Sequence, residues 1–170
     1  MTASSRKANL LAFLVVILLL GVTYYLQYYA GFVPCPLCLL QRFTMMGLGL
    51  IFFIGTIFFF QRTGKIILSV IAYIYALIGV LLAGRQVWLQ HMPTAISGTD
   101  CSASLEYMMQ ALPITQVMQK IFSGSAECSL VDWRFLHLSL AEWALLSFLA
   151  FLFFTACQFF SALRINRRWF

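Results

Sequence analysis

This sequence has few charged residues. Asp, Glu, Lys and Arg make up 9% of its 170 residues, against about 25% in a typical globular protein. Apolar and aromatic residues, counted with Cys, make up 62%, and a compact chain of this size cannot hide so much apolar surface from water. The composition therefore excludes a soluble enzyme, a disordered tail and a Lys/Arg-rich nucleic-acid-binding protein.

Residues that hold common cofactors are also few. The chain has two His and five Cys; no His follows Cys38 directly, as covalent haem attachment requires, and no long apolar run contains a His for a haem held between two of them. There is no Gly-x-Gly-x-x-Gly motif for a dinucleotide. Cys101 and Cys128 are 27 positions apart without a His near either, which does not fit a zinc site. We therefore expect no metal, haem or flavin.

Four long runs without charge account for most of the chain. A helix of about 19 residues is about 28 Å long, which matches the roughly 30 Å hydrocarbon layer of a bilayer. Runs of this length without alternation favour helices over barrel strands. We predict an all-α membrane protein in which residues 1–170 form one domain, a four-helix transmembrane bundle. The predicted spans are about 10–29, 43–61, 66–84 and 143–163.

Basic residues gather at one end of these spans. The N-terminal segment, the turn between the second and third spans, and the C-terminal segment carry seven Lys or Arg and no acidic residue. The predicted loops 31–42 and 85–142 carry four basic and five acidic residues. By the positive-inside rule both termini face the cytoplasm and both loops face outward. The net charge of +6 is thus a topology signal and does not indicate nucleic-acid binding.

The loop of residues 85–142 is the longest polar stretch. Within it, apolar residues recur at helical spacing over residues 114–122, and Pro113 stands at a suitable first helical position. This pattern predicts a short amphipathic helix, which either lies flat on the membrane or packs on the core of the loop itself.

The motif Cys35-Pro36-Leu37-Cys38 is the most informative element of the sequence. A disulfide across this spacing closes a very short ring and gains little loop entropy, so it is a poor structural crosslink. Closely spaced pairs are instead associated with easy thiol–disulfide exchange, and disulfides persist at the outer face of a membrane. We favour a redox-active pair over a passive crosslink.

Two features favour a thiolate at Cys38. Pro34 and Pro36 end the first span and let a new helix begin near Cys38, where first-turn amides stabilise negative charge. Arg42 follows one helical turn later on the same face. Arg42 either supports this chemistry or extends its charge to the interface, and its position on the side with few basic residues favours the first interpretation.

The remaining Cys residues and His91 leave alternatives open. Cys101 and Cys128 lie on the same predicted loop, where they can form a structural disulfide or a second pair in a thiol relay. Cys157 falls within the fourth span, and we expect it to pack among apolar side chains. His91, just beyond the third span, is either a cofactor-binding residue at the boundary or a solvated side chain.

This combination of spans and motifs resembles the disulfide bond formation protein B (DsbB) family of bacterial inner-membrane oxidases. The resemblance covers most of the chain and rests on these segments: Cys35-x-x-Cys38 with Arg42, Gly84–His91, Cys101, Ser123–Cys128 and Trp133–Leu136.

The resemblance implies a protein-dithiol:quinone oxidoreductase that supports disulfide formation in periplasmic proteins. Cys101, with Cys128 as its partner, would exchange with a DsbA-like thiol oxidase, and the electrons would pass to Cys35. Cys38 would be the thiolate next to ubiquinone or menaquinone, with Arg42 polarising the quinone.

Two other functions are compatible with parts of the pattern. One is a vitamin K epoxide reductase-like, quinone-linked thiol oxidoreductase, although there the loop cysteines precede the Cys-x-x-Cys motif, and here they follow it. The other is a non-catalytic membrane scaffold held by two structural disulfides.

Overall fold

Four long helices make up most of the computed structural model, which describes residues 2–29, 35–58, 62–91, 134–135 and 137–164. The helices are α1 (Thr2–Tyr29), α2 (Pro36–Ile57), α3 (Arg62–His91) and α7 (Leu140–Arg164). Each is long and apolar enough to cross a membrane. The predicted all-α, four-helix fold is therefore confirmed, while the amphipathic helix predicted within residues 114–122 lies outside the described residues.

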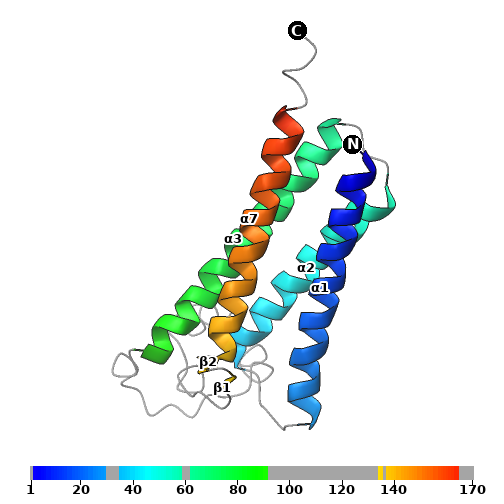
Figure 1. The fold of residues 1–170 in the computed structure, drawn as a ribbon. Helices are drawn as coiled ribbons and strands as arrows, with labels where there is room; N and C mark the ends of the chain where they lie inside the picture. The colour runs from blue at the N-terminus through cyan, green and yellow to red at the C-terminus, as the bar shows by residue number, and fades with distance from the viewer. Residues whose placement is uncertain (1, 30–34, 59–61, 92–133, 136, 165–170) are drawn as a thin grey trace, which may run out of the picture.

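The helices form an elongated bundle (Figure 1). α2 packs against both α1 and α3, and α3 packs along the length of α7. The start of α1 and the end of α7 lie at the same end of the bundle, and the start of α2 lies at the opposite end (Figure 1).

Two helices extend beyond the spans that the charge pattern predicted. α3 continues to His91, so residues 85–91, which were predicted in an outer loop, are helical. α2 begins at Pro36, within the stretch 31–42 that was predicted to lie outside the second span, but at the helix start that the two prolines predicted near Cys38. The spans were bounded at Arg42 and Arg85, but a charged residue ends an apolar run without ending a helix. Arg42 stays within α2 because its guanidinium bonds to groups on α1.

Glycines let aromatic rings of one helix approach the backbone of another. Phe148 of α7 is fully buried and packs on Gly79 of α3, where an added Cβ would overlap the ring. Gly47 of α2 gives the same room to the ring of Tyr75 on α3. Because lipid is as apolar as the side chains, such close packing is a main source of association between helices in a membrane.

Polar contacts join the helices near the end where α1 begins. Gln158 of α7 donates to the Oδ1 atom of Asn9 on α1 at 2.7 Å, and Asn9 is 6% exposed. Arg6 donates from Nε to the carbonyl oxygen of Thr56 at 2.9 Å. These bonds connect α1 to both α7 and α2.

A short hairpin leads into α7 at the opposite end. Strands β1 (Arg134–Phe135) and β2 (Leu138–Ser139) are antiparallel, with Phe135 paired to Leu138. The turn between them includes His137, whose φ of 67° lies in the left-handed region that glycine adopts most easily.

Ser139 and Glu142 form a capping box at the start of α7. The Ser139 amide donates to Glu142 Oε2 at 2.6 Å, and the Glu142 amide donates to Ser139 Oγ at 3.3 Å. Two backbone donors at the helix start are thereby satisfied.

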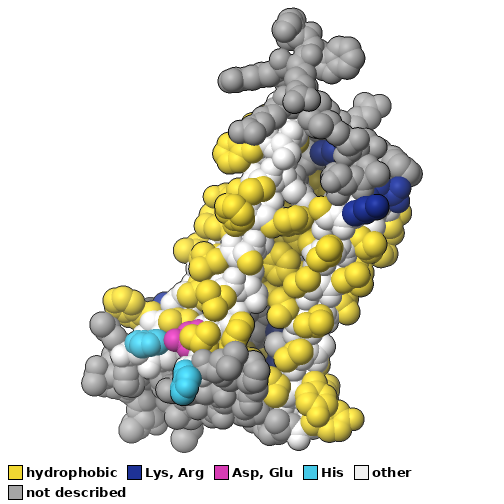
Figure 2. Space-filling view, viewed as in Figure 1, with side chains coloured by type: hydrophobic (Ala, Val, Ile, Leu, Met, Phe, Trp, Pro, Cys, Tyr) yellow, Lys and Arg dark blue, Asp and Glu magenta, His cyan; other side chains and the backbone are white. Residues whose placement is uncertain are grey.

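The surface of the bundle changes along its length. Figure 2 shows hydrophobic side chains over the middle of the molecule, most of the visible Lys and Arg near the end where α1 begins, and His and acidic side chains at the other end. The exposed apolar side chains include Leu11, Leu18, Leu81 and Phe153, each more than 60% exposed. A surface of this kind is stable only against lipid.

We predict that Gly79→Ala destabilises the bundle whereas Gly84→Ala, on the same helix, does not. The new methyl at position 79 meets the Phe148 ring, while nothing lies within 4 Å of a Cβ at position 84. Overpacking should lower the free energy of unfolding of Gly79→Ala by about 1–3 kcal/mol. Gly84→Ala should leave it unchanged or raise it by up to about 1 kcal/mol, through helix propensity. Thermal unfolding in detergent, followed by circular dichroism, measures both, and equal effects of the two variants would contradict this packing.

Candidate functional site

The start of α2 places the Cys35-Pro36-Leu37-Cys38 motif at one end of the bundle. Cys35 is the N-cap residue, with φ −67° and ψ 160°, and Pro36 occupies the first turn of the helix. The Cys35 carbonyl accepts the first helical hydrogen bond, from the Leu39 amide at 3.1 Å. Cys38 therefore lies in the first turn, as the sequence predicted, where backbone amides without helical partners point toward negative charge.

The two sulfur atoms of the motif are joined by a hydrogen bond, in which Cys35 Sγ donates to Cys38 Sγ, and not by a disulfide. Their Sγ atoms are 3.0 Å apart, about 1 Å more than a disulfide bond. Cys35 is 4% exposed, whereas Cys38 is half-buried. A small movement thus suffices to form or open the disulfide, and Cys38 is the sulfur more open to a reactant.

Two buried glutamines extend from this pair, of which one bonds to the sulfurs and the other bonds to the first. Gln86 of α3 donates from Nε2 to Cys38 Sγ at 3.1 Å and to Cys35 Sγ at 3.7 Å. Gln41 of α2 donates to Gln86 Oε1 at 2.6 Å. The sequence reasoning did not single out either residue as part of the site. The available signal was an uncharged polar residue within an apolar helix, which usually has a partner inside the bundle.

Arg42 lies one helical turn beyond Cys38 and makes contacts with α1. Its guanidinium donates to Gln27 Oε1 and to the Thr23 carbonyl oxygen, the latter at 3.3 Å. The Cζ atom also lies 5.1 Å from the centre of the Tyr24 ring, within the range of a cation–π interaction. A guanidinium carries five N–H donors, so these bonds to α1 use only some of them.

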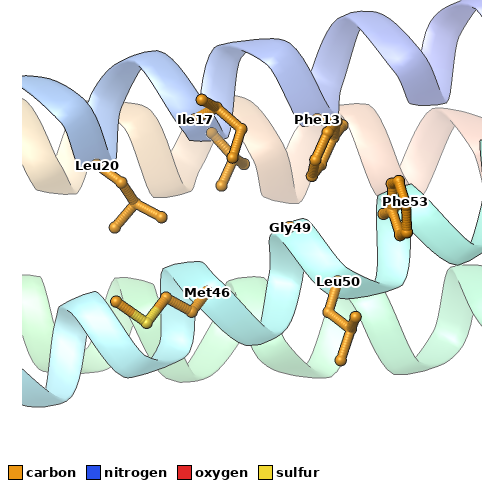
Figure 3. Close-up of a pocket in the computed structure, with 8 residues that line it drawn as sticks. Phe13, Ile17, Leu20, Met46, Gly49, Leu50 and Phe53 are labelled. Atoms are coloured by element: carbon orange, nitrogen blue, oxygen red, sulfur yellow. The ribbon is translucent and has the colours of Figure 1, made fainter.

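An apolar groove runs between α1 and α2, and it begins at Met46, one helical turn beyond Arg42. It has a volume of about 250 Å³. Figure 3 shows side chains from α1 and α2 facing each other across it. Its lining consists of Phe13, Val16, Ile17, Leu20, Met46, Gly49, Leu50 and Phe53. The groove thus offers room for an apolar molecule, and its nearest α2 residue, Met46, lies one helical turn from Arg42.

His91 is not joined to the sulfur pair by any contact among the described residues. It lies in the last turn of α3, where Nδ1 donates to the Val87 carbonyl oxygen at 2.9 Å. Its Nε2 atom is 3.9 Å from Glu142 Oε1, and its side chain is 66% exposed. Glu142 in turn caps α7, so the described contacts of His91 connect α3 to the start of α7.

The other three cysteines lie apart from this site or outside the described residues. Cys101 and Cys128 belong to the segment that the structure does not describe. Cys157 lies on α7 and is exposed, so the prediction that it packs within the bundle is wrong. The fourth span is apolar on all faces, and its sequence therefore gave little indication of which face turns outward. Over the described ranges, no group of three potential metal ligands comes together.

These features define a class of protein. A four-helix membrane bundle holds two thiols at the start of a helix, and the same helix carries an arginine one turn further on and one wall of an apolar groove beyond it. Such a pair can accept two electrons when its disulfide opens and release them when the disulfide closes again.

Comparison with known proteins assigns the family. The pattern of the family described as disulfide bond formation protein DsbB matches residues 5–158, and the chain belongs to this family. It is therefore an oxidoreductase of disulfide bond formation, and its four helices fit a multi-pass inner-membrane protein.

Curated relatives agree over nearly the whole chain. Disulfide bond formation protein B 1 of Pseudomonas aeruginosa is 41% identical over 157 residues, which cover 92% of this chain and 96% of the relative. Disulfide bond formation protein B of Stutzerimonas stutzeri is 38% identical over 147 residues, covering 86% and 90%. The protein of the same name from Hahella chejuensis is 36% identical over 148 residues, covering 87% and 89%.

Proposed function

We propose that this protein reoxidises a DsbA-like periplasmic thiol oxidase and passes the electrons to a membrane quinone. In the overall reaction, the dithiol of the oxidase becomes a disulfide, and the quinone takes up two electrons and two protons to become the quinol. The observation that carries this proposal is the position of Cys35 and Cys38 at the start of α2, with Arg42 one helical turn further along the same helix and an apolar groove that begins another turn beyond it, at Met46.

The two pairs of cysteines take different roles in this proposal. Cys101 and Cys128 form the outer pair, which exchanges with the thiol oxidase and then passes its electrons to Cys35. Cys38 is the sulfur on the quinone side, because it is less buried than Cys35 and lies one turn from Arg42. The loop pair thus handles a protein partner, and the helix pair handles a lipid-soluble one.

The residues present fit a quinone as substrate. A quinone has carbonyl oxygens that accept hydrogen bonds, on a ring whose isoprenoid tail is apolar. Arg42 supplies N–H donors, and the groove that begins at Met46 is lined by apolar side chains and Gly49. When bound, the quinone supplies a two-electron acceptor, and reoxidising a strongly oxidising thiol oxidase needs an acceptor of higher potential still. The protein positions the ring beside Cys38 and offsets negative charge through Arg42.

Charge distribution supports the orientation that this function needs. Seven Lys and Arg and no acidic residues are predicted on the side of the termini, and the described part of that end carries most of the visible basic side chains (Figure 2). We propose that both termini lie in the cytoplasm of a bacterium and that the sulfur pair faces the periplasm. We further propose that residues 1–170 act as a single membrane domain, with His91 at its outer boundary.

Replacing Cys38 or Cys101 with Ser is expected to abolish turnover, because either change interrupts the transfer of electrons through the two pairs. The assay mixes the purified protein with a reduced DsbA-like oxidase and a soluble quinone, and follows quinone absorbance. Cys157→Ser is the matched control and should keep the wild-type rate, since Cys157 is exposed on α7. A wild-type rate for either of the first two variants, or turnover without quinone, contradicts the proposal.

Arg42→Ala is expected to raise the KM for quinone about tenfold, which corresponds to about 1.4 kcal/mol of binding. The KM for the thiol oxidase should stay the same, because Arg42 lies on the groove side of the pair. Arg42→Lys keeps the charge but loses the planar fork of donors, so its KM for quinone should lie between the values of the wild type and Arg42→Ala. An unchanged KM for quinone in Arg42→Ala would remove Arg42 from the quinone site.

A further inference from the structure

The glutamines behind the sulfur pair form a directed chain of hydrogen bonds. Gln41 donates to the amide oxygen of Gln86, and Gln86 donates from its nitrogen to the two sulfur atoms. Both side chains are buried, at 7% and 5% exposure. Because the Gln86 oxygen is occupied by Gln41, the amide is held with its N–H groups toward the sulfurs.

This donor treats the two sulfurs unequally. The distance from Gln86 Nε2 is 3.1 Å to Cys38 Sγ and 3.7 Å to Cys35 Sγ. An ionised acceptor forms a much stronger hydrogen bond than a neutral one, and the sulfur of a thiol or a disulfide is a weak acceptor. The geometry therefore favours a state in which Cys38 carries negative charge.

Reduction of the pair produces such a state. The Cys35–Cys38 disulfide takes up two electrons and one proton to give a thiol at Cys35 and a thiolate at Cys38. The N–H group of Gln86 then stabilises the reduced form and leaves the disulfide almost unaffected.

We infer that Gln86 is a catalytic residue that holds the negative charge of the reduced pair on Cys38, and that Gln41 is a positioning residue that orients the Gln86 amide. The inference depends on the proposed function in one respect, namely that Cys38 is the sulfur from which electrons leave toward the quinone. Gln86 raises the reduction potential of the pair and selects the sulfur that reacts.

The first test measures the equilibrium of the pair with glutathione in the full-length protein, purified in detergent without quinone or thiol oxidase. Thiol trapping and mass spectrometry resolve the Cys35–Cys38 pair from the other cysteines. In this equilibrium, the disulfide and two glutathione thiols give the Cys35 thiol, the Cys38 thiolate, glutathione disulfide and one proton, so the measurements are made at one fixed pH. Gln86→Met keeps the side-chain length but removes the donor, and it should lower the equilibrium constant for reduction about tenfold, or about 30 mV.

Two further variants separate this role from packing. Gln41→Met keeps the Gln86 donor but no longer fixes the orientation of its amide. It should therefore lower the equilibrium constant for reduction by a smaller factor, roughly threefold. Gln158→Met is the matched control: it also loses an amide hydrogen bond between helices, to Asn9, but far from the sulfurs, and should change nothing. An unchanged constant in a folded Gln86→Met protein, or an equal change in Gln158→Met, overturns the inference. If Gln86→Met does not fold, the outcome for Gln41→Met decides.

The second test measures the alkylation rate of each cysteine in the reduced protein with iodoacetamide. Loss of charge stabilisation in Gln86→Met should slow the alkylation of Cys38 several-fold and leave that of Cys35 unchanged. A merely structural role for Gln86 has the opposite effect, because looser packing exposes both sulfurs and speeds both reactions; that result overturns the inference. Neither test uses quinone or a protein partner, so its outcome is separate from that of the proposed function.

Discussion

In the hydrocarbon layer of a membrane, each backbone N–H and C=O group must find its partner within the protein, and a helix satisfies this condition everywhere except at its ends. The start of α2 is one of these ends. Pro36 fits there because it has no N–H to satisfy, and Cys35 precedes it as the N-cap. The same local geometry brings Cys38 to the first turn, beside Cys35 and among amides that favour negative charge.

The rest of the bundle supports this helix start from two sides. α3 places Gln86 behind the sulfurs, and α1 places Thr23 and Gln27 where they hold the guanidinium of Arg42. Close packing at glycines sets the distances between helices over which these short polar side chains can reach one another. At the same end, Ser139 and Glu142 cap α7, and Glu142 also contacts His91. We propose that His91 lies at the outer boundary of the domain. The pair is thus held by a framework in which a buried amide bonds to the sulfurs and a cation lies one helical turn away.

Sequence patterns were sufficient for the four helices because long uncharged runs have few other stable forms in a membrane. They were also sufficient for the helix start near Cys38, since the two prolines mark it. The membrane spans were nevertheless bounded at Arg42 and Arg85, because these residues interrupt the apolar runs, although both helices extend past them. The contact between Gln41 and Gln86 joins residues 45 positions apart and depends on how α2 and α3 pack, which no local pattern contains. The outward position of Cys157 was missed because a helix that is apolar on all faces does not show which face turns to lipid.

The central claim is that electrons leave the protein from the helix pair toward quinone, and the redox state of that pair in membranes without quinone tests it most directly. Acid-quenched thiol trapping, resolved by mass spectrometry, reports Cys35 and Cys38 separately from Cys101 and Cys128. The account predicts that both pairs become reduced when quinone is depleted and reduced thiol oxidase is supplied, and that adding quinone reoxidises them. A Cys35–Cys38 disulfide that stays closed throughout would make it a passive crosslink and contradict the account.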